Sequence, residues 1–360
     1  MKRVLFLYKF GILGGVCTQL YHRLTVIPKN ELEVHCGFMG NHGAEDLLGG
    51  SCELHFSLDG NGMVELLERE KFDLVVIIDT EEYIQKILEM ETRPRVLIEV
   101  HTSIERNLEY LTRIPENLPY GFITVSEFMR EEVNKRVEYL EADKLKVMGN
   151  IIDTSEFTYS ELQRKEGVPP LVWVGKIDDH KNWRLAMEIS GGLRDRGVVH
   201  ELWFVGGHTA SGARAEEFFT YAEECGIIDT IKWFDKIEHS EISKLLRRAR
   251  NLGGVGLVTS KGESFGMSIL ESILVGLPVV SANSGAISEI SELSPALGLY
   301  ELQDSENAIK MISERIGGWR DNSEWCTILR EESALLAEKF GAEGMGREYW
   351  SHIIEICNVE

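Results

Sequence analysis

Two successive runs of short apolar strands, each strand followed by a helical pattern, constrain the fold of this chain most strongly. The first run starts with the buried-strand pattern 4–8 and includes the strong strand pattern FDLVVIIDT at 72–80. Periodicity then fades between Asp153 and Pro170, and the second run starts at Leu171. Strands that alternate with helices form parallel sheets covered by helices on both faces. The predicted fold class is therefore α/β, with two Rossmann-like, doubly wound parallel-sheet domains.

A chain of 360 residues is also longer than one ordinary hydrophobic core, which stops growing at about 250–300 residues. We expect domains at 1–155 and 156–340, and a C-terminal helix at 341–360 that packs back on the first domain. Ligands of doubly wound sheets bind beyond the carboxyl ends of the strands. With two such sheets, the functional site is expected in a cleft between the domains.

Charge and cysteine content exclude several classes of protein. The formal net charge is −21 and neither half is basic, which argues against nucleic acid as a partner. The six cysteines show no C-x-x-C spacing, which favours reduced thiols and disfavours structural zinc. No apolar run approaches ~20 residues, and the N-terminal apolar run is too short for a signal peptide. We expect a cytoplasmic protein without a transmembrane segment, and peripheral contact with the inner face of the membrane stays open.

The stretch 261–290 carries two carboxylates that core packing does not explain. Glu263 precedes a helix expected to begin near Phe265 or Gly266, and Glu271 lies on its second turn. Eight residues at ~100° each place two positions ~80° apart around a helix axis, so both can serve one cleft. The N–H groups of the helix N-terminus between them favour an anion. A nucleotide sugar, with phosphates and hydroxyl groups, is a ligand of this kind.

Both carboxylates also have an ordinary structural interpretation. An acidic residue before a helix is stabilised by ~0.3–1 kcal/mol without any ligand, which suffices to explain Glu263. For Glu271 this interpretation is weaker, because its neighbours mark a mostly buried helix and a buried carboxylate needs partners. Sugar or ribose hydroxyls would supply them.

Other strand ends offer further candidates. Lys176 and Lys181 follow the strand at Leu171, where they could neutralise a leaving diphosphate in a chain that has no D-x-D pair for a metal ion. Gly14 and Gly15 follow the first strand, as in a phosphate loop. Solvated lysines and an ordinary glycine turn are the alternatives.

His101 ends another buried strand and is either a satisfied core residue or a group that contacts the transferred moiety. A dinucleotide (NAD) fold is disfavoured, because the second strand ends in Cys36-Gly37-Phe38-Met39 without the acidic residue that such a fold needs.

These residues together resemble the retaining glycosyltransferases of family 4 (glycosyltransferases group 1), which have the two-domain GT-B fold. The run from Glu263 to Glu271 resembles that family's E-x7-E motif, and the run 171–182 is similar to its donor-phosphate loop. The resemblance also includes 203–207, Gly276 to Val280, Gly14-Gly15, His101, the run from Thr124 and the run 150–153.

The resemblance implies an acceptor-side domain at 1–155 that faces a donor domain at 156–340 across a cleft. It implies that Lys181 binds the donor diphosphate, Glu271 the ribose hydroxyls, and Glu263 and His101 the transferred sugar. The implied catalytic residues are His101, Lys181 and Glu263, with no metal ligand. The implied donor-binding residues are Gly14, Gly15, Lys176, Lys181, Ile237, Glu263, Phe265, Gly266, Met267 and Glu271.

Two positions depart from the family pattern. Lys176 stands where the family usually has arginine, which keeps the charge and loses the bidentate fork. Ile151 stands where a glycine usually follows Asn150, which makes that loop less permissive.

The resemblance implies retaining, metal-independent transfer of a sugar from a nucleotide sugar, with UDP- or GDP-sugars favoured and no cofactor. The acceptor would be a hydroxyl of a glycan, a lipid-linked or a small molecule, in surface-glycan or glycoconjugate biosynthesis. The departing phosphate is expected to act as the base. A nucleotide-sugar 2-epimerase of the same fold and a non-catalytic nucleotide-sugar-binding protein stay open.

Overall fold

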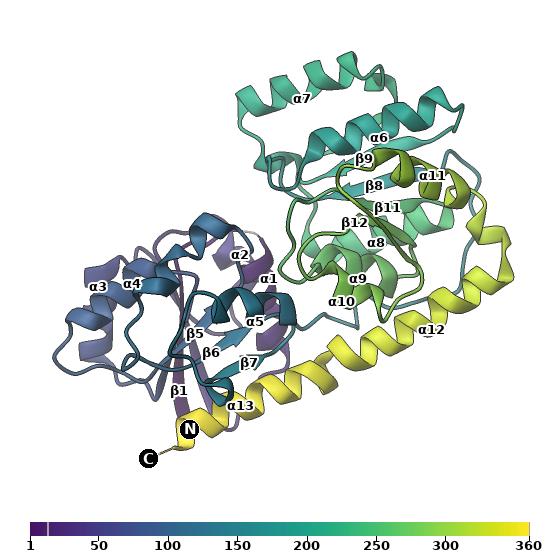
Figure 1. The fold of residues 1–360 in the computed structure, drawn as a ribbon. Coiled ribbons are helices and arrows are strands. Elements are labelled where there is room, and N and C mark those ends of the chain that lie inside the picture. Colours follow the sequence, from purple (N-terminus) through teal and green to yellow (C-terminus); the bar gives the residue numbers. More distant parts are fainter. Residues whose placement is uncertain (13, 360) are drawn as a thin grey trace. The chain divides into compact units, whose positions relative to one another are not determined.

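The computed structural model describes residues 1–12 and 14–359. It consists of two units (Figure 1). Unit 1 comprises Met1–Ile152 and Phe340–Glu360, and unit 2 comprises Asp153–Lys339. The chain therefore leaves unit 1 at Ile152 rather than at 155 and returns to it at Phe340 rather than at 341. Glu360, the last residue of the expected C-terminal segment, lies outside the described residues.

Unit 1 contains a parallel sheet with the strand order β3-β2-β1-β4-β5-β6-β7 in the described part of the chain. Its strands are β1 (Lys2–Tyr8), β2 (Leu32–Phe38), β3 (Glu53–His55), β4 (Leu74–Ile78), β5 (Val96–Val100), β6 (Pro119–Thr124) and β7 (Leu145–Val147). Its helices are α1 (Gly15–Thr25), α2 (Ala44–Leu48), α3 (Gly60–Arg69), α4 (Glu81–Glu89), α5 (Glu127–Asn134) and α13 (Arg347–Asn358). Short 3₁₀ turns lie at Glu105–Asn107, Glu109–Arg113 and Ala142–Lys144, and a π-turn lies at Ala342–Gly346.

Unit 2 contains a second parallel sheet, with the order β10-β9-β8-β11-β12-β13. Its strands are β8 (Pro170–Val174), β9 (Glu201–Val205), β10 (Ile231–Phe234), β11 (Val255–Val258), β12 (Val279–Ala282) and β13 (Leu297–Tyr300). Its helices are α6 (Trp183–Asp195), α7 (Gly212–Glu224), α8 (His239–Asn251), α9 (Met267–Leu274), α10 (Ile287–Ser291), α11 (Ser305–Arg315) and α12 (Ser323–Phe340), the last of which ends in unit 1. Short 3₁₀ turns lie at Gly207–Thr209, Ile228–Thr230 and Trp319–Asp321.

Parallel pairing throughout both sheets confirms the predicted class of two doubly wound α/β units. The central strands are buried on both faces, as in parallel sheets generally; all five residues of β4 and of β5 are buried. None of the described helices has the length and apolarity needed to cross a bilayer.

The glycines and the lack of periodicity between Gly37 and Gly62 predict a long loop or a pair of loops, and the structure differs from that prediction. The stretch contains α2 and the three-residue strand β3, which pairs with β2 through His35↔Glu53. A strand of three residues at the edge of a sheet is too short to show the period-2 alternation by which strands are recognised. The sequence does not predict the four-residue strand β13 or the five-residue helix α10 either, because each is too short for its periodicity to be recognised.

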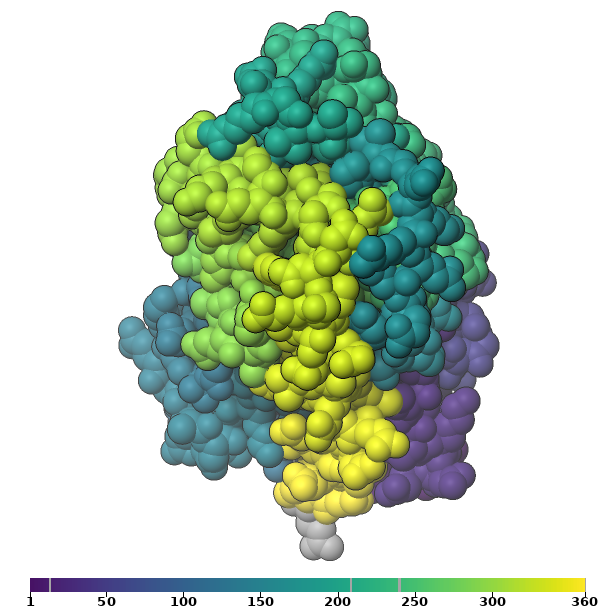
Figure 2. Space-filling model, turned by 90° about the vertical axis from the view of Figure 1, so that its right-hand side faces the viewer, coloured from purple at the N-terminus to yellow at the C-terminus, as the bar shows by residue number. Residues whose placement is uncertain are grey.

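The C-terminal helix α13 belongs to the core of unit 1. Its side chains Tyr349, Trp350 and Ile353 are buried in one cluster with residues of β1, β2 and α1. The indole N–H of Trp350 donates to the backbone oxygen of Arg23 at 3.0 Å. The solvent side of this C-terminal segment is visible in yellow in Figure 2. The last residues of the chain therefore help to fix α1 on the sheet.

Candidate functional site

Two adjacent strands of unit 2, β8 and β11, end in loops that are tied to each other. The backbone N–H of Lys261 donates to the backbone oxygen of His180 at 2.9 Å. The Thr259 hydroxyl lies 2.9 Å from the backbone oxygen of Lys181 and accepts the indole N–H of Trp173 at 3.0 Å. The parallel pairing of β8 with β11 places both loops at the carboxyl edge of the sheet, where ligands of this architecture bind.

These loops bring two of the predicted residues into contact. The Lys181 ammonium donates to Glu263 Oε1 at 2.6 Å, and the Ser260 hydroxyl donates to the same oxygen at 2.6 Å. Burial alone would raise the pKa of Glu263, but the Lys181 ammonium and the Ser260 hydroxyl outweigh it and lower that pKa. Glu263 is therefore held as an ionised carboxylate, and the Lys181 ammonium compensates its charge.

A glycine loop fixes the backbone of Glu263 as well. The N–H of Ala286 donates to the Glu263 backbone oxygen at 2.8 Å. Gly285 has a φ of +65°, and a Cβ added there would lie 2.1 Å from that oxygen, so only glycine fits. The loop that follows β12 thus holds the loop that follows β11.

Helix α9 begins close to the predicted start at Phe265 or Gly266. Its N-cap is Gly266, with a φ of +90° that favours glycine, and its first helical residue is Met267. Glu263 thus lies in the preceding loop and not on the helix, so the expected 80° angle between the two carboxylates does not apply. The N–H of Ile269 donates to the Gly266 backbone oxygen at 3.1 Å, whereas the first N–H groups of a helix, here those of Met267 and Ser268, have no acceptors within it, which suits this end to an anion.

Glu271 differs from Glu263 in its surroundings. Its side chain is buried, with 7% exposed, and none of the described residues forms a hydrogen bond or an ion pair with its carboxylate. Burial raises its pKa to about 8. A buried acid without partners is costly to keep unless a ligand supplies hydrogen-bond donors.

The remaining predicted residues of unit 2 lie at the same edge of the sheet. Lys176 is exposed after β8, and no ion pair engages it among the described residues. Ile237 is half-buried between β10 and α8, and Phe265 is buried beside Gly266. The structure brings Lys181 into contact with Glu263 and gives no such contact for Lys176 or Ile237.

In unit 1, Gly14 and Gly15 form the start of α1. Gly14 is the N-cap with an extended φ of −177°, a conformation open to any residue. A Cβ at Gly15 would meet no atom within 4 Å. Neither local conformation nor packing therefore explains Gly15, which leaves room for a ligand beside this helix end.

His101 follows β5 in unit 1, where two carboxylates hold it. Its Nε2 lies 2.9 Å from Glu99 Oε2, and its backbone N–H lies 3.1 Å from both oxygens of Asp79. Burial raises the pKa of Asp79 to about 6, and its φ of 42° is unusual for an aspartate. Because Glu99 engages Nε2, the ring is fixed and its Nδ1 side remains for other contacts.

Glu99 is the centre of a buried hydrogen-bond network that the sequence analysis does not predict. It accepts from Arg23 Nη1 at 2.7 Å and from the Tyr349 hydroxyl at 2.5 Å. Burial opposes its ionisation, but Arg23, His101 and Tyr349 outweigh burial and lower its pKa to about 2. A glutamate inside the apolar strand VLIEV was the local indication of this network, and Asp79 at the end of VVIID was the other.

Comparisons with known proteins relate part of this chain to glycosyltransferases. Residues 155–294 match the family Glycosyl transferases group 1, and this segment contains every donor-side residue named above for unit 2. The D-inositol 3-phosphate glycosyltransferase of Corynebacterium efficiens is 26% identical over 242 residues, which cover 59% of this chain and 56% of that protein. Glycogen synthase of Mycobacterium tuberculosis is 24% identical over 169 residues, 47% of this chain and 39% of that protein. The chain spans about half the length of the curated relatives it matches.

Among solved structures, HepE of Anabaena in complex with UDP and glucose has a TM-score of 0.80 at 15% identity, covering 99% of this chain and 100% of that one. Sucrose-phosphate synthase from Thermosynechococcus elongatus has a TM-score of 0.79 at 14% identity, covering 99% of both chains. These likenesses confirm the GT-B fold.

Proposed function

We propose that this protein is a retaining, metal-independent glycosyltransferase that moves a sugar from a nucleotide sugar to an acceptor hydroxyl. The observation that carries the proposal is Glu271, a buried carboxylate without a protein partner, in a segment that matches the Glycosyl transferases group 1 family. The two hydroxyls of a ribose are donors of the kind that would satisfy this carboxylate. The complex of HepE with UDP and glucose supports a UDP-sugar donor, with a GDP-sugar as the second choice.

In this proposal, each of the other residues binds a different part of the donor. The first turn of α9, with Phe265, Gly266 and Met267, and the lysines Lys176 and Lys181 bind the diphosphate. Glu263 is assigned to the transferred sugar, Ile237 to the base, and Gly14 and Gly15 to donor binding. His101, also in unit 1, contacts the sugar through the side of its ring that Glu99 leaves open.

The reaction breaks the bond between the anomeric carbon and the oxygen of the β-phosphate. The electron pair of that bond stays on the phosphate oxygen, whose charge Lys181 and the end of α9 stabilise. The acceptor oxygen attacks the anomeric carbon from the same face and passes its proton to the departing phosphate. Glu263 stays paired with Lys181 and Ser260 and is not assigned the role of a covalent nucleophile.

The acceptor is proposed to be a glycan, a lipid-linked molecule or a small molecule in surface-glycan or glycoconjugate biosynthesis. The proposed place of action is the cytoplasm, free or at the inner face of the membrane.

A thermal-shift screen of UDP-, GDP- and ADP-sugars tests the donor directly, because a ligand of the native state raises the melting temperature by mass action. We expect one nucleotide class to stabilise the wild type and not the Glu271→Gln variant. Equal stabilisation of both proteins would refute the proposed site.

Incubation with the donor alone separates the alternatives. Epimerised sugar in the absence of an acceptor would identify a 2-epimerase. Binding without hydrolysis or transfer to any acceptor tried would identify a non-catalytic nucleotide-sugar-binding protein.

A further inference from the structure

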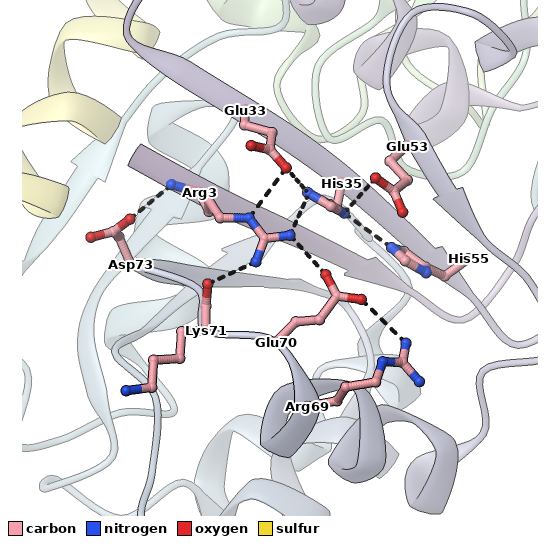
Figure 3. A network of polar contacts seen from close by, with 9 residues as sticks. All are labelled: Arg3, Glu33, His35, Glu53, His55, Arg69, Glu70, Lys71 and Asp73. Carbon is pink, nitrogen blue, oxygen red and sulfur yellow. Dashed lines mark hydrogen bonds and ion pairs between the residues drawn. The ribbon is translucent and has the colours of Figure 1, made fainter. Parts of the chain in front are cut away.

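A cluster of ionisable side chains lies at the β3 edge of the unit 1 sheet (Figure 3). His35 on β2 pairs in register with Glu53 on β3, and His55 follows Glu53 by two residues. Side chains two residues apart on a strand leave the same face of a sheet. The three residues, called the edge cluster below, therefore meet on one face although they come from two strands.

The donor atoms of the edge cluster are spaced like the ligands of one ion. His35 Nδ1 lies 3.1 Å from His55 Nε2 and 3.7 Å from Glu53 Oε2. One ligand atom from each of the three residues lies within 4.8 Å of the others. Atoms ~2.0–2.2 Å from a tetrahedral Zn²⁺ lie roughly 3.3–3.6 Å apart. The 3.1 Å and 3.7 Å separations from His35 Nδ1 lie close to that spacing.

Glu33 and Arg3 both contact Nε2 of His35. Glu33 Oε1 lies 2.8 Å from His35 Nε2 and accepts from Arg3 Nε at 3.2 Å, and Arg3 Nη2 lies 3.1 Å from the same Nε2. These contacts fix the ring, so Nδ1 is the nitrogen of His35 that faces Glu53 and His55.

A carboxylate that holds the far nitrogen of a histidine is the usual support of a metal-bound histidine. Here the support is rigid, because Arg3 also binds Glu70 at 2.7 Å and lies over the ring of Phe72. His35 itself is fully buried. The result is a fixed imidazole whose Nδ1 lies 3.7 Å from a carboxylate oxygen of Glu53 and 3.1 Å from Nε2 of His55, a spacing that one cation could bridge.

We propose that His35, Glu53 and His55 bind one divalent cation of the Zn²⁺ class, with water completing its coordination. Two imidazoles and one carboxylate are ligands that Zn²⁺ accepts, with an open fourth position. Glu53 is largely exposed, at 61% of its side chain, so an ion can enter from solvent. The ion would join the three-residue edge strand β3 to β2. None of the proposed donor-site residues belongs to this cation site, so a test of the cation site is independent of the transferase activity.

Calorimetric titration of the chelator-treated, full-length protein with ZnCl₂ tests the proposal. The wild type is expected to bind one equivalent, and His55→Ala and Glu53→Ala are each expected to lose at least tenfold in affinity. His42→Ala is the matched control, since His42 is an exposed histidine of the same unit, and it should bind like the wild type. Both test variants alter partly exposed side chains, so they avoid the core position His35.

Titration with Co²⁺ distinguishes the edge cluster from the cysteines, because a thiolate ligand gives a charge-transfer absorption and imidazole does not. We expect a Co²⁺ spectrum without that absorption, and a melting temperature raised by Zn²⁺ in the wild type and in His42→Ala only. Wild-type affinity in His55→Ala, a thiolate spectrum, or no binding of Zn²⁺ by the wild type would each overturn the proposal.

Discussion

Glu99 in unit 1 and Glu271 in unit 2 are both buried glutamates, yet their environments are opposite. Glu99 is surrounded by Arg23, His101 and Tyr349, which lower its pKa to about 2. Glu271 has no partner among the described residues, and burial raises its pKa to about 8. The first carboxylate is satisfied by its own fold, whereas the second has the environment expected for its proposed role of binding ribose hydroxyls.

The difference separates a structural role from a binding role without reference to any relative. A buried charge that is fully paired costs little to keep, whereas an unpaired one destabilises the native state. A site that retains such a cost is a candidate for ligand recognition. The following experiments test this distinction between Glu99 and Glu271.

The largest effect is expected from Glu99→Ala, which leaves the buried Arg23 guanidinium without its carboxylate. Loss of one partner of a buried pair costs about 3–5 kcal/mol of the unfolding free energy. Chemical denaturation measures it. Glu89→Ala, which removes the exposed Lys86–Glu89 pair, is the control and should cost less than about 1 kcal/mol. Equal costs in the two variants would show that the Glu99 network contributes no more than a surface pair.

Glu271→Gln should weaken donor binding while leaving the protein at least as stable as the wild type. The amide is neutral, so it avoids the burial cost, but it accepts fewer hydroxyl groups than a carboxylate. We expect transfer to fall by roughly 100-fold, equivalent to about 2.7 kcal/mol. Glu292→Gln, at an exposed position after α10, is the matched control. Wild-type turnover in Glu271→Gln would contradict the assignment.

Stability should depend on pH in opposite directions for the two glutamates. The folded pKa of Glu271 lies above its unfolded value of 4.5, so its contribution is full below pH 4.5 and is lost as pH rises through about 8. The folded pKa of Glu99 lies below 4.5, so its contribution is full above pH 4.5 and is lost as pH falls towards about 2.

Unfolding free energies measured between pH 5 and pH 8 should therefore show the Glu271→Gln variant gaining stability relative to the wild type, by at most about 1.4 kcal/mol per pH unit. A constant difference between the two proteins over this range would mean that Glu271 does not titrate there.

The smallest effect is expected from Tyr349→Phe. The change removes the hydrogen bond from the Tyr349 hydroxyl to Glu99 and the one that this hydroxyl accepts from Arg23 Nη1 at 3.0 Å. It keeps the aromatic ring, whose face the Arg23 guanidinium covers at 3.9 Å. A hydrogen bond to a charged group contributes about 1.5–3 kcal/mol, and the bonds from Arg23 and His101 to Glu99 remain, so a loss near the lower value is expected. A loss of unfolding free energy as large as that of Glu99→Ala would mean that Tyr349 contributes most of the stability of the Glu99 network.

Local patterns predicted most of the strands and helices and, to within two residues, the start of α9, because these depend on apolar periodicity and on residues that lie close together in sequence. The sequence predicts only that Lys181 and Glu263 lie near each other, because both follow strands that end at the same edge of a sheet. It does not predict their ion pair. The Glu99–Tyr349 bond joins residues 250 positions apart, and no local pattern encodes it.

The edge cluster could not be predicted from the sequence for a similar reason. His35 and Glu53 become neighbours only through the pairing of β2 with β3, and β3 is too short to be recognised in the sequence. The expectation of no zinc rested on cysteine spacing and does not bear on a site made of two histidines and a glutamate.

Proton release on donor binding tests the central claim most directly. A carboxyl group with a pKa near 8 must lose its proton when two ribose hydroxyls donate to it, since those bonds favour the ionised form. Calorimetry with UDP-glucose at pH 7, in buffers of different ionisation enthalpy, counts the protons released. We predict release approaching one proton per UDP-glucose in the wild type, with tight binding and release both lost in Glu271→Gln. Equal affinity and equal proton release in the two proteins would contradict the account.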